Sequence, residues 1–132
     1  MVFLDASPVI YHVEQPPTWG PKASARIAAL VAAGELLAVT DLVRMECLVG
    51  PLKKHDAHLL NDFRTFFNSP EVRVLPITAA VADRAATIRA THGVKPLDAL
   101  HLAAAVEHGC ARFLTNDSGL KFFPDIPVEV LS

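Results

Sequence analysis

The stretch Val2-Phe3-Leu4-Asp5-Ala6-Ser7-Pro8 contains a transition from strand to helix that the rest of the chain repeats. Val2–Leu4 is an uninterrupted apolar run of the kind that forms a buried parallel strand. Ser7 followed by Pro8 predicts a helix start, with serine as the N-cap and proline as the first helical residue. We expect a short helix from there through Tyr11. A strand followed at once by a helix is the building unit of an α/β fold.

Further apolar segments of strand length recur along the chain and alternate with segments of helical period. The predicted strands are Val2–Leu4, Leu36–Thr40, Val72–Leu75, Arg112–Thr115 and Val128–Leu131. The predicted helices after the first are Lys22–Ala33, Asp41–Val49 (closed by Gly50 and Pro51), Leu52–Phe67, Thr78–Thr91 and Leu97–His108. This alternation predicts an α/β sandwich, in which helices cover both faces of a mainly parallel sheet.

Length and composition indicate one soluble globular domain over residues 1–132. One hydrophobic core serves a chain of this length, and 52% of the residues are hydrophobic while 20% are charged. The N-terminus lacks the basic start and apolar length of a secretion signal, and no apolar run approaches the roughly 20 residues that span a bilayer. Cys47 and Cys110 form no CxxC pair, so we expect a cytoplasmic protein without metal-thiolate or redox chemistry.

The net charge of −2 excludes one class of nucleic-acid-binding protein. Proteins that hold duplex DNA through many phosphates present a broad basic surface, which this composition does not provide. Any site for nucleic acid on this chain should therefore be local.

Four acidic residues occupy positions that suggest a shared site. Asp5 and Asp117 each follow a predicted strand, and the carboxyl ends of parallel strands are where ligands collect in such a sheet. Glu46 and Asp98 lie in predicted helices among apolar neighbours, where an ionised carboxylate needs a partner. Nearby basic residues are too few for four acids. Oxygen ligands without cysteine favour Mg²⁺ or Mn²⁺, and such a site suits hydrolysis of phosphodiesters.

Each acid taken alone also has a purely structural explanation. Asp5 could cap a turn, Glu46 could pair with Arg44, Asp98 could stabilise a helix N-terminus, and Asp117 could close an Asx-turn. The functional interpretation therefore depends on the four acting together.

Two other residues have a functional and a structural interpretation. His101 follows Asp98 by three residues, so a metal-binding pair is conceivable, but we favour a hydrogen-bonded, partly buried histidine. For Trp19 we favour packing on its own domain over stacking on a nucleic-acid base.

Four segments of the chain, Val2–Ser7, Arg44–Gly50, Pro96–Ala103 and Phe113–Asp117, resemble PIN-domain ribonucleases in order and spacing. Small size makes the chain most similar to VapC-type toxins of bacterial toxin–antitoxin pairs. The resemblance implies an α/β/α sandwich, a Mg²⁺ or Mn²⁺ site, endonucleolytic cleavage of RNA, a cognate antitoxin and a homodimer. It assigns the acidic metal ligands and catalytic residues to Asp5, Glu46, Asp98 and Asp117, with Ser7, Thr115 and Asn116 in supporting positions. Ser7 departs from the asparagine often found there.

The leading hypothesis is therefore a metal-dependent endoribonuclease that acts as a toxin. A catalytically inactive PIN-like module that binds RNA or protein is the alternative, which degraded acid motifs would favour. A small-molecule phosphatase is weaker still, because Asp5-Ala6-Ser7 lacks a second acid two residues after the first.

Overall fold

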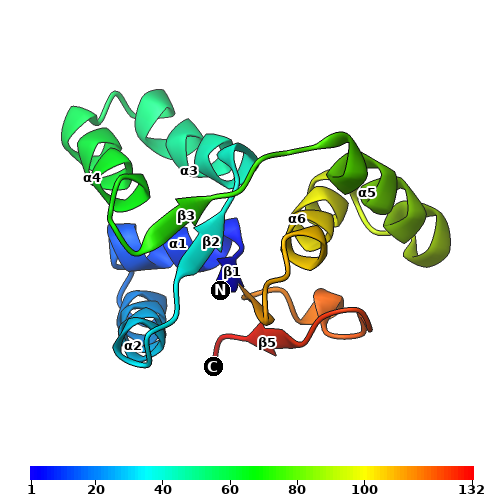
Figure 1. The fold of residues 1–132 in the computed structure, drawn as a ribbon. Helices are drawn as coiled ribbons and strands as arrows, with labels where there is room; N and C mark the ends of the chain where they lie inside the picture. Colours follow the sequence, from blue (N-terminus) through cyan, green and yellow to red (C-terminus); the bar gives the residue numbers. More distant parts are fainter.

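The computed structural model describes all residues from 1 to 132 and contains a five-stranded sheet flanked by six α-helices (Figure 1). The strands are β1 (Val2–Leu4), β2 (Leu37–Val39), β3 (Val72–Val74), β4 (Arg112–Thr115) and β5 (Val128–Val130). Their order is β3-β2-β1-β4-β5, and every neighbouring pair is parallel. All five predicted strands are confirmed, with no end displaced by more than one residue.

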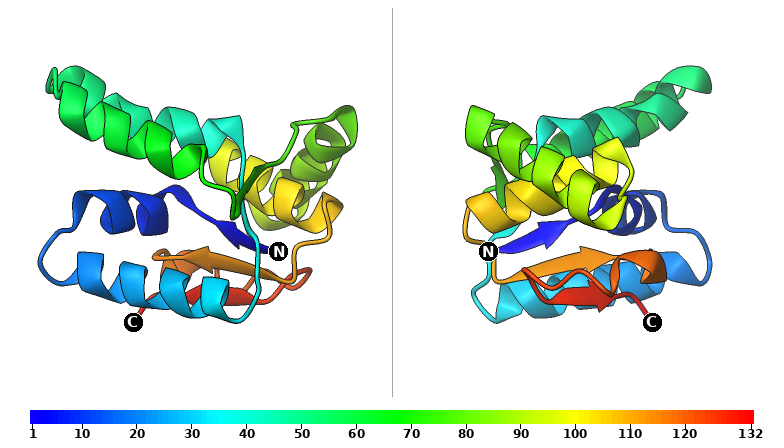
Figure 2. Two further views of the ribbon diagram at one scale, coloured as in Figure 1. Left: turned by 60° about the vertical axis from the view of Figure 1, so that its left-hand side comes forward. Right: turned by 90° about the vertical axis from the view of Figure 1, so that its right-hand side faces the viewer.

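The helices are α1 (Ala6–Glu14), α2 (Trp19–Ala32), α3 (Asp41–Lys53), α4 (Ala57–Phe67), α5 (Ala79–His92) and α6 (Pro96–Glu107), and a short 3₁₀ helix, η1 (Ser118–Leu120), follows β4. In Figure 1, α1, α2 and α4 lie on one side of the sheet and α5 and α6 on the other. Figure 2 shows the molecule turned about the vertical axis, so that first the left-hand side and then the right-hand side of Figure 1 comes toward the viewer. The predicted three-layer α/β/α sandwich is confirmed.

The start of α1 differs from the prediction. Asp5, not Ser7, is the N-cap: its backbone is extended and its side chain accepts a hydrogen bond from the amide of Ala6. Pro8 then lies within the first turn, where its missing N–H is not needed. The helix also continues to Glu14 rather than ending near Tyr11. The residue that directly follows β1 and the N-cap of α1 are thus the same acid, Asp5.

The predicted end of α3 at Gly50 and Pro51 is wrong, and so is the start of the next helix at Leu52. α3 runs through Pro51 to Lys53, and Gly50 does not adopt a positive φ. Pro51 is buried, so packing of its ring offsets the hydrogen bond that proline cannot donate. The chain turns at His55, which has a positive φ of 52°. α4 begins only after its N-cap, Asp56.

The core is one continuous cluster of 34 buried apolar residues. Phe3 on β1 and Phe113 on β4 stack at its centre, with ring centroids 5.3 Å apart. Trp19 at the start of α2 stacks on Tyr11 of α1, so it packs on its own domain as predicted. None of the helices is long and apolar enough to cross a lipid bilayer.

The strand order creates a switch point beside β1. From β1 the chain adds β2 and then β3 on one side, and then returns to place β4 on the other side. Right-handed crossovers in opposite directions put their helices on opposite faces of the sheet, which leaves a crevice at the carboxyl ends of β1 and β4. Asp5 directly follows β1, and Asp117 lies two residues beyond β4.

Candidate metal centre

Asp5 is fixed in place by hydrogen bonds to both of its carboxylate oxygens. Its side chain is nearly buried, and Oδ1 accepts from the backbone amide of Ala6 at 2.9 Å. Oδ2 accepts from the hydroxyl of Thr115, at the end of β4, at 2.7 Å. The Thr115 oxygen in turn accepts from the backbone amide of Asp117 at 3.0 Å. One buried hydroxyl therefore ties the acid after β1 to the segment that carries the acid after β4.

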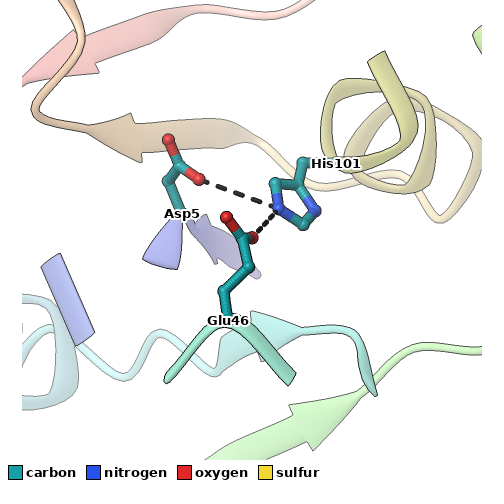
Figure 3. A group of neighbouring side chains, drawn as sticks. All are labelled: Asp5, Glu46 and His101. Carbon is teal, nitrogen blue, oxygen red and sulfur yellow. Dashed lines mark hydrogen bonds and ion pairs between the residues drawn. The ribbon is translucent and has the colours of Figure 1, made fainter. Parts of the chain in front are cut away.

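Glu46 reaches the same place from α3. This helix starts directly after β2 with Thr40 as its N-cap, which places Glu46 in the second turn. Figure 3 shows the carboxylates of Glu46 and Asp5 facing the same ring nitrogen of His101 from α6, with Glu46 the nearer of the two. The distance from His101 Nε2 to Glu46 Oε1 is 2.5 Å, and to Asp5 Oδ1 it is 3.9 Å. Potential ligand atoms of these three residues all lie within 4.8 Å of one another.

The surroundings of His101 determine which of its nitrogens carries the proton. The residue is 1% exposed, and its Nδ1 has no hydrogen-bond partner in the protein. Carboxylates only accept hydrogen bonds, so Nε2 carries the proton and donates it to Glu46. The structure therefore contains a hydrogen-bonded histidine at position 101, as the sequence predicted, although it is fully rather than partly buried.

Asp98 lies in the first turn of α6, behind Pro96 at the start of the helix. Burial raises the pKa of its carboxyl, and the negative charge of Asp5 raises it further. Asp117 and Glu46 add to this effect, whereas His101 opposes it. The negative charges of the other three acids thus reach the Asp98 carboxyl. The close group of potential ligand atoms, however, contains Asp5, Glu46 and His101, and neither Asp98 nor Asp117 belongs to it.

Asp117 is the most exposed of the four acids, and a tight turn holds it. Its Oδ1 accepts from the backbone amide of Gly119 at 2.8 Å, so it caps η1. A Cβ atom at position 119 would lie 2.9 Å from that oxygen, closer than real Cβ contacts allow. Only glycine fits there without moving the carboxylate. Asp117 and Asp98 line one shallow pocket of about 210 Å³.

The three supporting positions behave differently from one another. Thr115 contacts an acid directly, as described above. The Asn116 side chain instead donates to the hydroxyl of Tyr11 at 3.0 Å, which links the loop after β4 to α1. Ser7 lies half-buried in the first turn of α1, and no hydrogen bond joins its side chain to the acids.

The link between His101 and Glu46 is the main feature of the site that sequence reasoning missed. The spacing of Asp98 and His101 made a metal-binding pair of these two conceivable but named no partner for a hydrogen-bonded histidine, and the imidazole faces Glu46 on α3 and Asp5 directly after β1. Its place in an almost wholly apolar helix was the one available signal that it is buried.

The donor set fits a hard divalent cation. No lysine or arginine forms an ion pair with any of the four acids, although several such pairs exist elsewhere in the molecule. Carboxylates in a partly buried cluster need positive charge, and oxygen-rich sites of this kind favour Mg²⁺ or Mn²⁺. Asp5, Glu46, Asp98 and Asp117 are the residues that would hold the ion.

Comparison with known proteins gives one match to a family and several to solved structures. The model of the family described as "PIN domain" matches residues 2–126 of the chain. No curated protein sequence matches it.

The similar structures cover almost all of the chain. One is VapBC2 from Rickettsia felis bound to a fragment of promoter DNA, with a TM-score of 0.80, 17% identity and coverage of 100% of both chains. Another is VapC20 from Mycobacterium tuberculosis, described as a toxin that cleaves the sarcin-ricin loop, with a TM-score of 0.75, 16% identity, and coverage of 96% of this chain and 99% of that one. FitAcB from Neisseria gonorrhoeae has a TM-score of 0.74 and 22% identity over 97% and 96% of the two chains. At these identities the likeness is one of fold.

Proposed function

Since the chain belongs to the PIN domain family, we propose that it is a Mg²⁺- or Mn²⁺-dependent endoribonuclease, and that it acts as the toxin of a toxin–antitoxin pair. One observation carries the catalytic part of this proposal. Asp5 and Glu46 offer potential ligand atoms within 4.8 Å of each other, Asp98 and Asp117 line one pocket, and no lysine or arginine pairs with any of these four acids. A binding module without catalytic activity would gain nothing from ionised carboxylates that are unfavourable to bury near one another.

The proposed roles follow from the contacts of each side chain. The four acids would hold the cation, and Thr115 and His101 would orient Asp5 and Glu46 through the hydrogen bonds that they donate. When bound, a divalent ion polarises the phosphodiester and promotes ionisation of the attacking water. In-line attack of that water at phosphorus would break the bond to the 3′ oxygen, leaving a 5′-phosphate and a 3′-hydroxyl.

The partners that we propose are an RNA substrate, a cognate antitoxin and a second copy of the chain, all in the cytoplasm. Similar folds occur in the structures of VapBC and FitAB toxin–antitoxin complexes, which supports the antitoxin. One face of α3 exposes Met45, Val49 and Leu52, which are 51%, 45% and 56% exposed. Spacings of four and three residues place these side chains in one stripe, and a stripe of this kind is a candidate protein interface.

The Asp5→Asn variant tests the catalytic proposal. Asparagine keeps one oxygen, which can still accept from the Ala6 amide as the N-cap of α1, and its NH₂ group can donate to the Thr115 hydroxyl in place of the hydrogen bond that Asp5 accepts. The fold should therefore persist while the metal loses a charged ligand. We expect cleavage of RNA in Mg²⁺ to fall at least about 100-fold, a typical loss when part of the catalytic electrostatics is removed. We also expect EDTA to abolish cleavage by the wild-type protein.

Asp83→Asn, which changes an exposed acid on α5, is the matched control and should cleave like the wild-type protein. Expression of the wild-type chain, but not of Asp5→Asn, should arrest bacterial growth. Wild-type cleavage rates in the Asp5→Asn protein would show that the proposed catalytic site is wrong.

A further inference from the structure

The segment that follows the last acid exposes an aromatic side chain. Six of the seven phenylalanines are buried, namely Phe3, Phe63, Phe66, Phe67, Phe113 and Phe123. The seventh, Phe122, is 54% exposed. Exposure of a large apolar ring to water is unfavourable. The groups that surround Phe122 therefore indicate whether the exposed ring has a functional role.

Phe122 lies beside the acids. It lines the same pocket as Asp98 and Asp117, together with His92, the last residue of α5, and Lys95 from the connection between α5 and α6. Three separate segments therefore meet at this pocket: the end of α5, the first turn of α6 and the chain after β4. Its volume of about 210 Å³ is smaller than the roughly 300 to 1,000 Å³ of pockets for whole small ligands. It suits one planar ring system.

The neighbours of Phe122 hold it in a defined position. The next residue, Phe123, is 4% exposed and anchors the backbone in the core. The ring of His92 contacts both: its centroid lies 5.4 Å from that of Phe122 and 5.8 Å from that of Phe123. Phe122 and His92 thus form a supported aromatic surface on the wall of the pocket. Phe123 is buried in the core, whereas its neighbour Phe122 is exposed.

We propose that Phe122 and His92 form a subsite for an unpaired nucleobase of the RNA, next to the phosphodiester that is cleaved. This subsite presupposes the nuclease function proposed above. Proteins bind single-stranded nucleic acid by stacking bases on exposed aromatic rings, and every base offers a face for this contact. Covering the Phe122 ring would also remove its exposed apolar surface from water.

Charge and position favour RNA as the occupant. Two walls of the pocket carry acids that we assign to cleavage of a phosphodiester, so a substrate bound there places a sugar and base at the aromatic surface. Exposed Lys95 offers a positive charge to a neighbouring phosphate. A paired base in a duplex has its faces covered, so the subsite selects unpaired segments of RNA.

Binding of a short single-stranded oligoribonucleotide in Mg²⁺ tests this subsite. The protein carries Asp5→Asn to prevent turnover, and the oligonucleotide contains 2-aminopurine, whose fluorescence falls when the base stacks. Adding Phe122→Ala should weaken binding about 5- to 150-fold, the range that corresponds to about 1 to 3 kcal/mol for a stacked base. It should also restore the fluorescence of the base. Phe122→Trp should retain both properties.

Ile77→Ala is the matched control, because Ile77 is also an exposed apolar residue, at 41%, but precedes the opposite end of α5. With 14 residues, α5 separates it from the pocket by about 21 Å. Removing the base from one nucleotide gives a second test. The abasic oligonucleotide should bind the parent protein more weakly than the intact one, and the Phe122→Ala protein should no longer distinguish the two.

The proposal is overturned if Phe122→Ala leaves oligonucleotide binding and fluorescence unchanged, as expected if Phe122 is instead a contact for a partner protein. It is overturned as well if the parent protein does not bind single-stranded RNA. The same holds if Phe122→Trp weakens oligonucleotide binding as much as Phe122→Ala does. Failure of the nuclease proposal has a different signature. In that case the wild-type protein would not cleave RNA, while the stacking signal would still depend on Phe122.

Discussion

Asp98 is a residue whose ionised form is unfavourable in the folded protein without metal. Burial and the charge of Asp5 raise the pKa of its carboxyl above the ordinary value of 3.8. An acid with a raised pKa destabilises the fold as the pH rises through the unfolded and then the folded pKa. The cost of the cluster should therefore be present at neutral pH and absent in strong acid, and a bound cation should remove it.

We expect Asp98→Asn to raise the melting temperature of the metal-free protein at pH 7. Because Asp98 is partly exposed, solvent screens the repulsion, and the increase should stay below about 4 °C, the shift that about 1 kcal/mol produces in a domain of this size. Below about pH 3.8 the difference should vanish. Mg²⁺ should stabilise the wild-type protein and stabilise the variant less. Thermal melts with EDTA or Mg²⁺ measure both effects, and a variant less stable than the wild type at pH 7 without metal would contradict the prediction.

His101 shows how far sequence reasoning reaches at the residue scale. The four acids could be proposed as metal ligands from the sequence because each has a local signature, either a position after an apolar strand or apolar helical neighbours. The contact between His101 and Glu46 joins residues 55 apart in the chain. Spacing along one helix gives no information about such a contact, because the packing of α6 against α3 determines it.

At the scale of elements, the ion pairs of Glu129 join β5 to α2 and β4. Arg26 of α2 donates two hydrogen bonds to this carboxylate, at 2.6 and 2.8 Å, and Arg112 of β4 donates one at 2.8 Å. The hydrogen bonds from Arg26 are the main reason that the pKa of Glu129 is lowered from its ordinary value of 4.5. For an acid with a lowered pKa, the stability is present above the unfolded pKa and is lost as the pH falls through the folded pKa.

We expect Glu129→Gln to lower the melting temperature at pH 7 by about 4 °C or less, since partly exposed ion pairs contribute up to about 1 kcal/mol. The difference from the wild type should shrink as the pH falls from 4.5 through the folded pKa of Glu129. High salt should reduce it too. Glu14→Gln, an exposed glutamate without an ion pair, is the control. An equal loss of stability for both variants would mean that the ion pairs contribute nothing specific.

The limits of prediction at this scale lie in the connections rather than in the strands. A short apolar run has few alternatives to a buried parallel strand, so all five strands could be identified from the sequence. The end of α3 could not, because Gly50 and Pro51 are the usual signals for a helix end. Burial of Pro51 and the left-handed backbone of His55 extend the helix beyond them. Both features arise where α3 turns into the next helix, α4, against which it packs, and the local glycine and proline signals do not specify that packing.

For the whole molecule, one continuous core predicts one cooperative unfolding transition. The circular dichroism of the helices and the fluorescence of Trp19, the sole tryptophan, should therefore change together. Calorimetry should give an unfolding enthalpy of about 90 kcal/mol near 60 °C, from about 0.7 kcal/mol for each residue. Two transitions, or two probes with different midpoints, would mean that the 132 residues do not unfold as one domain.

The hydrogen bond between Asp5 and Thr115 spans 110 positions of the chain, and this separation sets the order of events during synthesis. A ribosome releases Asp5 early, but the strand that completes the site leaves the exit tunnel only after most of the protein has been made. Until β4 inserts beside β1, Asp5 lacks its threonine partner and Asp117 is absent. Nascent or prematurely terminated chains therefore contain no assembled centre, so the proposed activity would be present only in finished molecules.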